Sequence, residues 1–563
     1  MRRWQIGTLV FFVMAIVLSA LVACVVTQST ESDNLLVTLP DLGKVQGSIT
    51  HSAWTNQEVY QFLSIPYAEA PSGNLRFKAP VPKKPWDETV DGTKYGRRCP
   101  VSTHVNAAEA DSVDIEDCLS LCVYTKNFKA NASVMFYIYG GGFYNGTHAD
   151  HPPHYLMEKD IVLVVPQFRL GALGWMSLRN KKVPGNMGFM DVLTALKWVQ
   201  ANIHNFGGNA ANVTVFGQSA GAVQTSLLTM SPGVPDGLFN KVITASGSVF
   251  GHWAVNEKPF DLAKSICEGI KCPRGCGDSQ AIHGCLMKAS VPNIIKVTSS
   301  MSFSPSTEDF FGYLPTTPTE LAKTYKRKYP VMAGVTRHDG SFVTASIYDG
   351  LNAQLKGNWS GITTRALIDM MFVADDLGDK SGIIRQTLTK LLFEEQYLES
   401  TDFKASIPAY IDLHGIGWMK SPLLTFLRTS SQSPAGDNYL YSFDYAGEHT
   451  RFGYEFGNDW YPFEGGVHHS NDNIYLWSTH KLNEKDTEIA KKMVDIWTSF
   501  AITGKPSHGG IDIPKFNGDN GPYFHINEEI TIGQDFLDEL VTTVRDPKRD
   551  DMIRQDVPWG TGP

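Results

Sequence analysis

The chain has 563 residues and a formal charge of −9 at pH 7, with 19% charged and 11% aromatic residues. These values are typical of a globular protein with an ample core, and the chain has no low-complexity tract or internal repeat that would indicate a disordered or solenoid protein. The acidic balance argues against nucleic acid as a partner.

The N-terminal segment directs the chain across a membrane. Arg2 and Arg3 precede an apolar run from Ile6 to Val26, which is the pattern of a signal sequence. We predict that residues 1–29 form a cleaved signal peptide and that the protein is secreted. The alternative is a type II membrane anchor, because the 21 residues of this run would span about 30 Å as a helix. In either case the rest of the chain lies outside the cytosol, and contact with a membrane is expected only if the run is retained.

The cysteine content agrees with an oxidising compartment. Cys122 lies in an alternating apolar segment that starts at Cys118, so we interpret it as a buried free thiol. This leaves Cys99 to pair with Cys118, and two disulfides among the four remaining cysteines. Four cysteines allow three pairings, between which the sequence does not choose. The four are Cys267, Cys272, Cys276 and Cys285.

Three sequons indicate positions for N-linked glycans. Asn-X-Ser/Thr is the acceptor pattern in exported proteins, and we predict glycosylation at Asn131, Asn145 and Asn358. A fourth sequon at Asn212 opens a predicted core strand, and we expect it to be too buried for modification.

Strand-like and helix-like segments alternate from residue 133 onward. Short runs rich in Val, Ile and aromatic residues predict strands, and longer runs with a 3.6-residue apolar period predict helices. This alternation predicts an α/β fold with a mainly parallel sheet wrapped by helices. No linker divides the chain, so residues 30–563 are predicted to form a single domain. The expected strands are Leu35–Thr38, Val59–Ile65, Val134–Tyr139, Ile161–Val165, Val213–Phe216, Lys241–Ala245, Pro330–Val335 and Tyr439–Phe443, and the expected helices are Met190–Asn205, Thr487–Ala501 and several between Ser300 and Ala435.

A glycine-rich segment, Tyr139-Gly-Gly-Gly-Phe143, directly follows one of the predicted strands. Consecutive glycines let peptide N–H groups point into a site where side chains would block the approach. We predict that the N–H groups of Gly141 and Gly142, together with that of Ala220, form an oxyanion hole. The alternative is a turn that binds no ligand, in which the glycines only allow Phe143 to pack.

The segment His148-Ala-Asp-His151-Pro-Pro-His154 superficially resembles a set of metal ligands. Pro152 and Pro153 break the helix that would align the three imidazoles. Tight metal sites need convergent ligands on a rigid frame. We therefore predict no metal and no cofactor.

The stretch from Asn212 to Thr229 places a serine between a strand and a helix. An apolar run precedes Gly217-Gln-Ser-Ala-Gly221, and a run of helix-forming residues follows it. The two glycines permit a sharp corner that exposes the Ser219 hydroxyl at the helix N-terminus, as in a nucleophile elbow. The G-x-S-x-G pattern also occurs in ordinary turns, and the flanking strand and helix favour the nucleophile.

Two later loops offer the acid and the base that a serine nucleophile needs. Asp339 follows the predicted strand Pro330–Val335, and the pair His468-His469 follows the predicted strand Tyr439–Phe443. We predict Asp339 as the acid and His469 as the base, with His468 as the alternative base because adjacent residues point in different directions. Serine, acid and histidine then occur in the chain order of this fold class. A surface-turn Asp and an exposed loop His are the competing interpretations.

These motifs lie in a chain that resembles a known family. From about Leu35 to Arg545 the chain is similar to the type-B carboxylesterases of the cholinesterase-like group, which implies the α/β-hydrolase fold with helical cap insertions. Besides the motifs above, the resemblance is carried by Ile65-Pro-Tyr-Ala68, Leu75-Arg-Phe77, Glu116-Asp-Cys-Leu119, Phe168-Arg-Leu-Gly171, Gly185-Asn-Met-Gly188 with Asp191, Ala195-Leu-Lys-Trp198, Asn202-Ile203 and Phe206-Gly-Gly208.

The resemblance also implies roles for individual residues. It implies a catalytic triad and oxyanion hole at the positions predicted above, and ion pairs and disulfides elsewhere. The chain departs from the family at Asp339, where Glu is more frequent, and in the loop after Cys99, which has no Trp to stack on a choline ammonium. The implied pairs are Arg76 with Glu116, Arg169 with Asp191, Cys99 with Cys118, and a further disulfide within Cys267 to Cys285.

The sequence therefore predicts a serine carboxylesterase that hydrolyses a small-molecule ester through an acyl-enzyme. The alternative is a catalytically weak or inactive adhesion or binding protein that keeps the same fold. No triad position is missing, which favours the enzyme. The sequence does not define the natural ester, because cap residues shape the pocket, and it leaves the oligomeric state open.

Overall fold

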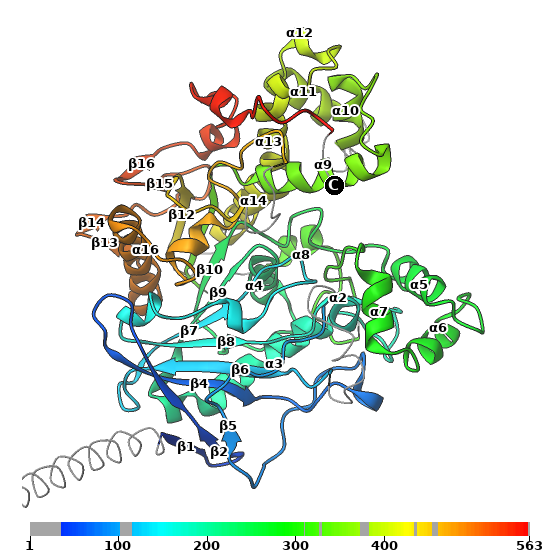
Figure 1. The fold of residues 1–563 in the computed structure, drawn as a ribbon. Coiled ribbons are helices and arrows are strands. Elements are labelled where there is room, and N and C mark those ends of the chain that lie inside the picture. Colours follow the sequence, from blue (N-terminus) through cyan, green and yellow to red (C-terminus); the bar gives the residue numbers. More distant parts are fainter. Residues whose placement is uncertain are drawn as a thin grey trace, which may run out of the picture.

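A large, mostly parallel sheet forms the centre of the molecule (Figure 1). The structure is a computed structural model that describes residues 35–101, 115–308, 310–325, 329–371, 382–432, 436–452 and 460–560. The α/β fold predicted from the alternation of segments is confirmed. Within the described residues the sheet has 11 strands, in the order β16 (Ile530–Gly533), β15 (Tyr523–Ile526), β12 (Asn438–Phe443), β11 (Val331–Thr336), β10 (Lys241–Ala245), β9 (Gly208–Gln218), β7 (Ala132–Ile138), β8 (Ile161–Pro166), β6 (Ser120–Thr125), β4 (Glu58–Pro66) and β3 (Ser48–His51).

The middle strands of this sheet run parallel to one another. β15, β12, β11, β10, β9, β7 and β8 pair in parallel with their neighbours, whereas the strands beyond them on either side pair antiparallel. The carboxyl ends of parallel neighbours lie at one edge of a sheet, where α/β proteins build their sites. The residues that follow β9, β10, β11 and β12 therefore meet at this edge although they are distant in sequence.

The predicted elements are present with shifted bounds. β9 begins at Gly208 rather than Val213, because Gly208 and Asn209 still pair with β7 before the register shifts. The helix α3 (Met187–Asn202) begins earlier than Met190 and gives way to a 3-10 turn that ends at Gly207, whose φ is 77°. Pairing of Gly208 and Asn209 with β7 extends the strand, and the tight turn at Gly207 follows the helix. Neither feature has an apolar period that the sequence could reveal.

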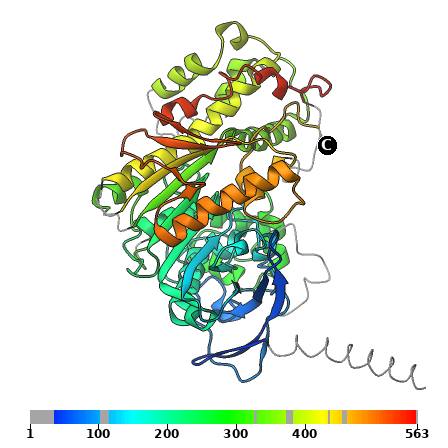
Figure 2. The same ribbon diagram turned by 90° about the vertical axis from the view of Figure 1, so that its left-hand side faces the viewer.

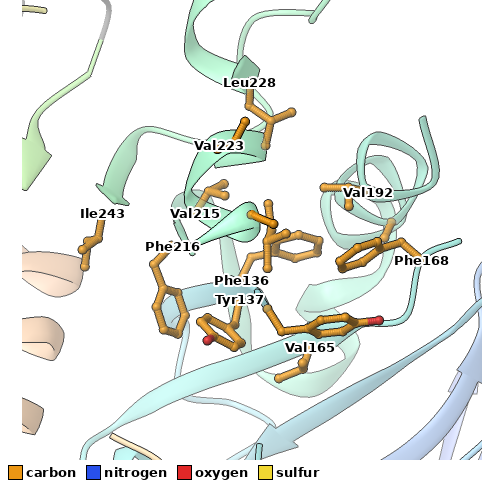
Figure 3. Close-up of a cluster of buried hydrophobic side chains, with 14 of the residues drawn as sticks. Phe136, Tyr137, Val165, Phe168, Val192, Val215, Phe216, Val223, Leu228 and Ile243 are labelled. Carbon is orange, nitrogen blue, oxygen red and sulfur yellow. The ribbon is translucent and has the colours of Figure 1, made fainter. Parts of the chain in front are cut away.

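Helices cover both faces of the sheet. α3 and α4 (Ala220–Met230) lie on one face, and α16 (Glu484–Thr503) crosses the other (Figures 1 and 2). Val215 of β9 projects toward Val223 of α4, whereas Phe216 and Tyr137 project to the opposite side (Figure 3). There Phe216 stacks on Trp477, with ring centroids 6.1 Å apart. The central strands are apolar on both faces because both faces are buried.

Two groups of helices are inserted after β10 and β11 (Figure 1). They include the helices expected between Ser300 and Ala435, and the second group encloses its own buried cluster around Tyr348, Leu367 and Tyr410. A π-helical turn, η8 (Gly415–Lys420), joins the last two helices of this group. The first group contains α5 (Pro259–Ile270), α6 (Ser279–Leu286), α7 (Val291–Thr298) and α8 (Pro318–Thr324), and the second contains α9 (Gly340–Leu355), α10 (Thr364–Met371), α11 (Ile383–Leu392), α12 (Glu395–Leu398), α13 (Ile407–His414) and α14 (Ser421–Ser431).

The remaining described elements are small. Besides several 3-10 turns, they are the strands β1 (Leu36–Leu39), β2 (Gly43–Gln46) and β5 (Val90–Asp91), the short helix α2 (Gly171–Trp175), and the hairpin of β13 (Ser507–His508) and β14 (Ile511–Asp512). The structure also contains a buried free thiol at Cys122. Its disulfides join Cys99 to Cys118, which the sequence predicted, and Cys267 to Cys276 and Cys272 to Cys285, a pairing that the sequence left open.

The fold bears on two parts of the export prediction, the membrane-crossing segment and the N-glycosylation sites. Among the residues that the structure describes, no helix is long and apolar enough to cross a membrane, and the signal peptide or anchor predicted for residues 1–29 lies outside them. Asn131 and Asn358 are exposed and Asn145 is half-buried. Asn212 is half-buried rather than fully buried as expected, and its side-chain amide is held by hydrogen bonds to Ser133 on β7 and to the first residue of β10.

Two buried ion pairs tie the chain segments around the sheet together. Arg76 pairs with Glu116. Arg169 donates from Nη2 to Asp191 Oδ1 at 2.7 Å and from Nε to Oδ2 at 2.8 Å, and these side chains are only 3% and 0% exposed. Removing one partner of a buried pair leaves an uncompensated charge in a medium that solvates it poorly.

A partly buried cluster around the half-buried His525 links the ends of β12 and β15. His525 Nδ1 lies 2.6 Å from Asp444 Oδ2, and His525 Nε2 lies 3.8 Å from Glu539 Oε1. Burial disfavours the charged imidazole, but the hydrogen bond to Asp444 and its charge outweigh burial and raise the pKa of His525. Burial likewise raises the pKa of Asp444, but hydrogen bonds from His525 and Ser442 outweigh it and lower that pKa. The histidine is therefore stabilised in its charged form.

The buried pair predicts a large stability loss for Asp191→Asn. The variant keeps the shape of the side chain but leaves Arg169 without its counter-charge, so the free energy of unfolding should fall by about 3–5 kcal/mol. Urea unfolding followed by fluorescence measures this change. As the control, Glu320→Gln removes the exposed partner of Lys323 and should cost less than about 1 kcal/mol. Equal losses of unfolding free energy in the two variants would show that the buried Arg169–Asp191 pair stabilises the fold no more than an exposed pair does.

The Asp444–His525 contact predicts a stability loss that depends on pH. Because the pKa of His525 is raised on folding, its contribution is fully present below the unfolded pKa of about 6.5 and disappears as pH rises through the folded pKa. His525→Gln should therefore lower the urea midpoint more at pH 5.5 than at pH 9. The exposed His204 provides the control, since His204→Gln should have the same small effect at both pH values. A loss for His525→Gln that does not change with pH would refute the charged state.

Candidate active site

Ser219 lies on the sharp corner between β9 and α4. Its backbone has φ 56° and ψ −126°. Residues other than glycine rarely adopt this conformation, and those that do cluster at functional sites. The Ser219 N–H donates to the carbonyl of Ala245 at the end of β10, 2.8 Å away. A Cβ at Gly217 would lie 2.5 Å from the Gly221 carbonyl oxygen, and a Cβ at Gly221 would lie 1.9 Å from the Ile138 carbonyl oxygen. Both flanking glycines are thus required by close backbone contacts.

The glycine-rich segment after β7 packs directly against this corner. A Cβ at Gly140 would lie 2.9 Å from the Ser219 Cβ. Gly141 and Gly142 have φ values of 109° and 59°, and within the described residues no backbone carbonyl accepts their N–H groups. Ala220 is the first residue of α4, where helical N–H groups lack intrahelical acceptors. The glycine-rich segment thus lies against Ser219, and the N–H groups of Gly141 and Gly142 are not used in backbone hydrogen bonds within the described residues.

Asp339 and His469 meet beside the same corner. Asp339 follows β11 and is the residue before α9, and its Oδ1 accepts a hydrogen bond from His469 Nδ1 at 2.6 Å. The two side chains are 0% and 3% exposed. With Nδ1 donating, the other ring nitrogen of His469 is an acceptor. That nitrogen, Nε2, lies 3.2 Å from the side-chain amide nitrogen Nε2 of Gln218, the residue before Ser219. The lone pair of His469 therefore faces the strand end that carries the serine.

The second oxygen of Asp339 is also occupied. Oδ2 accepts from the hydroxyl of Ser246 at 2.7 Å and from the N–H of Thr336 at 3.2 Å. Ser246 directly follows β10, and its own N–H donates to the Gly334 carbonyl of β11. Neither Ser246 nor Gln218 was singled out from the sequence. Only their positions in the chain could have indicated them, since Ser246 follows a central strand and Gln218 directly precedes the candidate nucleophile.

His468 has different contacts from its neighbour. Its Nδ1 lies 2.8 Å from the hydroxyl of Ser341 in the first turn of α9. His469 is the member of the pair that bonds to Asp339. The structure thus separates two histidines that the sequence could distinguish only by preference.

A second carboxyl group lies close to this pair. Burial and the nearby charge of Asp339 raise the pKa of Asp472 to about 6. The Tyr441 hydroxyl is 3.4 Å from Asp472 Oδ2. The charge of Asp339 therefore penalises a second carboxylate charge at Asp472.

A cavity lies beside the loop that follows β10. Trp253 packs on Phe143 and donates from Nε1 to the carbonyl oxygen of Trp418 at 3.0 Å. Next to Trp253, a cavity of about 1040 Å³ opens between the loop after β10 and the helices α8, α11, η8 and α14. Its apolar wall includes Phe250, Leu388 and Ile416. Ser219, Asp339 and His469 do not line this cavity.

The three histidines between His148 and His154 lie in different surroundings, and neither ring nitrogen of His148 has a hydrogen-bond partner among the described residues. His148 is buried against Tyr95 and His151 is buried against Tyr137, whereas His154 bonds to the carbonyl of His51. Among the described residues two other groups bring three ligand atoms within 4.8 Å of one another. One consists of cysteines that form disulfides, and the other is the Asp444, His525 and Glu539 cluster, which is internally bonded.

The chain is similar to known proteins over most of its length. The model of the carboxylesterase family matches residues 33–543. Glutactin of Drosophila melanogaster is 26% identical over 523 residues, which are 88% of this chain but 50% of glutactin, so the chain spans about half of that protein. Juvenile hormone esterase of Tribolium castaneum is 29% identical over 515 residues, or 86% of each chain. Esterase FE4 of Myzus persicae is 29% identical over 488 residues, which are 82% of this chain and 84% of the relative.

Proposed function

The chain belongs to the carboxylesterase family of carboxylic ester hydrolases, and we propose that Ser219, His469 and Asp339 carry out the hydrolysis through an acyl-enzyme. The observation that supports the proposal most is the buried hydrogen bond between Asp339 and His469, 2.6 Å long, beside the strained Ser219 corner. It holds the imidazole in the tautomer that accepts a proton on Nε2. A base in that state is what a serine nucleophile needs.

The proposed reaction uses these groups in two steps. Ser219 Oγ attacks the ester carbonyl carbon while His469 Nε2 takes the hydroxyl proton, and the tetrahedral oxyanion is held by the N–H groups of Gly141, Gly142 and Ala220. The carbon–oxygen bond to the alcohol breaks, and His469 gives its proton to the leaving alkoxide. Water then attacks the acyl-enzyme with His469 as base, and the carboxylic acid departs as Ser219 recovers its proton.

Asp339 has a distinct part in this scheme. It stays ionised and stabilises the imidazolium that forms on His469, without taking the proton itself. Ser246 and the Thr336 N–H hold its other oxygen, so the carboxylate cannot rotate away from the ring. The substrate is proposed to be a small-molecule carboxylic ester, as for the esterases to which the chain is similar.

The protein is further proposed to act outside the cytosol. Disulfides persist in oxidising compartments, and the structure contains one between Cys99 and Cys118 and two neighbouring ones within Cys267 to Cys285. The exposed sequons at Asn131 and Asn358 and the apolar N-terminal run support secretion, with a retained type II anchor as the alternative.

The proposal predicts that a fluorophosphonate probe labels Ser219. Intact mass and peptide mapping of the purified secreted protein should show one adduct on the peptide that contains Ser219, with loss of ester hydrolysis. Ser219→Ala should abolish labelling and lower kcat by about 10⁴-fold or more. An unlabelled protein without esterase activity, correctly folded by circular dichroism, would favour the binding-protein alternative.

The contact on the acid predicts an effect of Ser246→Ala. The variant removes one hydrogen bond to a charged carboxylate, which is worth about 1.5–3 kcal/mol, so kcat should fall about tenfold or more with little change in KM. Steady-state kinetics on a chromogenic acetate ester measures this. Ser248→Ala is the matched control, because the Ser248 hydroxyl accepts from the Phe250 N–H and does not touch Asp339. The prediction fails if both variants keep the wild-type kcat.

A further inference from the structure

The loops that carry the acid and the base are joined by contacts other than the Asp339–His469 bond. We call Thr336–Gly340 the acid loop and Gly465–Asp472 the base loop. An aspartate carries its carboxylate on a single methylene, so it reaches a partner only where the two backbones lie close together. The 2.6 Å contact to His469 therefore requires something that fixes the spacing of the loops.

His338, the residue before Asp339, makes two bonds to one residue of the base loop. Its N–H donates to the carbonyl of Val467 at 3.0 Å, and its ring Nδ1 accepts from the N–H of Val467 at 2.9 Å. The same segments form an isolated parallel bridge between His338 and His468. A backbone bond and a side-chain bond to the same residue fix both the separation and the relative orientation of the loops.

A second chain of contacts runs alongside. The Ser341 hydroxyl donates to the His338 carbonyl at 2.8 Å, which leaves its oxygen to accept from His468 Nδ1, also at 2.8 Å. His468 therefore ties the base loop to the start of α9, while its neighbour His469 bonds to Asp339. The two adjacent histidines have separate roles for this reason.

The contact between the loops leaves no free space. A Cβ at Gly466, where φ is 59°, would lie 2.5 Å from His338 Nδ1. The base loop thus packs directly on the imidazole of His338, and any side chain at position 466 would push the loops apart. Glycine is also favoured there by the positive φ.

The His338 ring is kept in an unfavourable setting. The side chain is buried, and within the described part of the chain its Nε2 has no hydrogen-bond partner. Burial and the nearby charge of Arg337 lower the pKa of His338 to about 3, so the ring stays neutral and Nδ1 keeps its lone pair. A buried donor without a partner destabilises a fold. A buried histidine with an unpaired ring nitrogen is unusual in a folded protein, which indicates that the bond made by its other nitrogen has a role besides packing.

We propose that His338 is a positioning residue that sets the distance between the acid loop and the base loop to the length of an aspartate side chain. This inference rests on the proposed function, in which Asp339 orients His469. His338 touches neither the substrate nor the reacting atoms, and acts only through Asp339 and Val467.

The test is a double-mutant cycle between positions 338 and 339. In the full-length wild-type chain, Asp339→Glu should lower kcat about 100-fold, because a carboxylate displaced by about 1.5 Å is misplaced at fixed loop spacing. His338→Leu, which fills the space without an acceptor, should lower kcat about tenfold with KM unchanged. In the His338→Leu background the loops can separate, so Asp339→Glu should cost less than about tenfold. His338→Asn, which offers an amide oxygen near the position of Nδ1, should retain most of the activity.

His414 provides the matched control. It is also buried, bonds through Nδ1 to the Thr344 hydroxyl at 2.9 Å and has no Nε2 partner among the described residues, but this bond joins α13 to α9 and does not join the acid loop to the base loop. His414→Leu should lower the thermal midpoint, and its effect should multiply with that of Asp339→Glu.

The outcomes separate this inference from the proposed function. If wild-type protein neither hydrolyses esters nor reacts with a fluorophosphonate, the proposed function fails. If wild-type protein is active but the two effects multiply, or if His338→Asn is as impaired as His338→Leu, the positioning role is wrong. Should His338→Leu not accumulate as folded protein, His338→Gln replaces it in the cycle, because its amide oxygen is displaced by one methylene and should show the same non-additivity.

Discussion

The hydrogen bond between Asp339 and His469 is the contact on which the proposed chemistry depends. Both side chains are almost fully buried, so water does not compete for the bond and the local dielectric strengthens it. Fixing Nδ1 also fixes the direction of Nε2, which faces the end of β9. A free imidazole could rotate or change its tautomer, and would then present a donor instead of an acceptor to Ser219.

The sheet and its loops supply the conditions for that bond. Parallel strands bring Ser219, Ser246 and Asp339 to one edge, and the base loop reaches them through His338 and Val467. The strained backbone of Ser219 is unfavourable by about 1–3 kcal/mol. It is held by the Ala245 carbonyl and by glycines that allow close backbone contacts. Rigid support of this kind keeps the polar groups in position before a substrate arrives.

Much of the fold can be predicted from the sequence, because the spacing of apolar residues indicates strands and helices, and the two glycines around Ser219 indicate a tight turn. The α/β fold and the strand positions followed from these local signals. The candidate residues Ser219, Asp339 and His469 were chosen by motif and chain order. The shifted start of β9 depends on pairing with β7, which a single segment cannot reveal.

Other features depend on contacts between distant segments and have no local signal. The choice between His468 and His469 depends on loop geometry, and the disulfide pairing at Cys267 to Cys285 depends on how α5 and α6 pack. The Ser246 bond to Asp339 joins two strands. The contact of His338 with Val467 joins residues 129 positions apart. Side-chain networks of this kind become visible only when the backbone is placed.

The most direct measurement is a crystal structure of the protein after reaction with a fluorophosphonate. The account predicts a phosphorus–oxygen bond to Ser219 Oγ, a phosphoryl oxygen within hydrogen-bond distance of the N–H groups of Gly141, Gly142 and Ala220, and His469 still bonded to Asp339 with Nε2 toward the adduct. An adduct on another residue, or an imidazole turned away from Ser219 with the Asp339 bond broken, would contradict it.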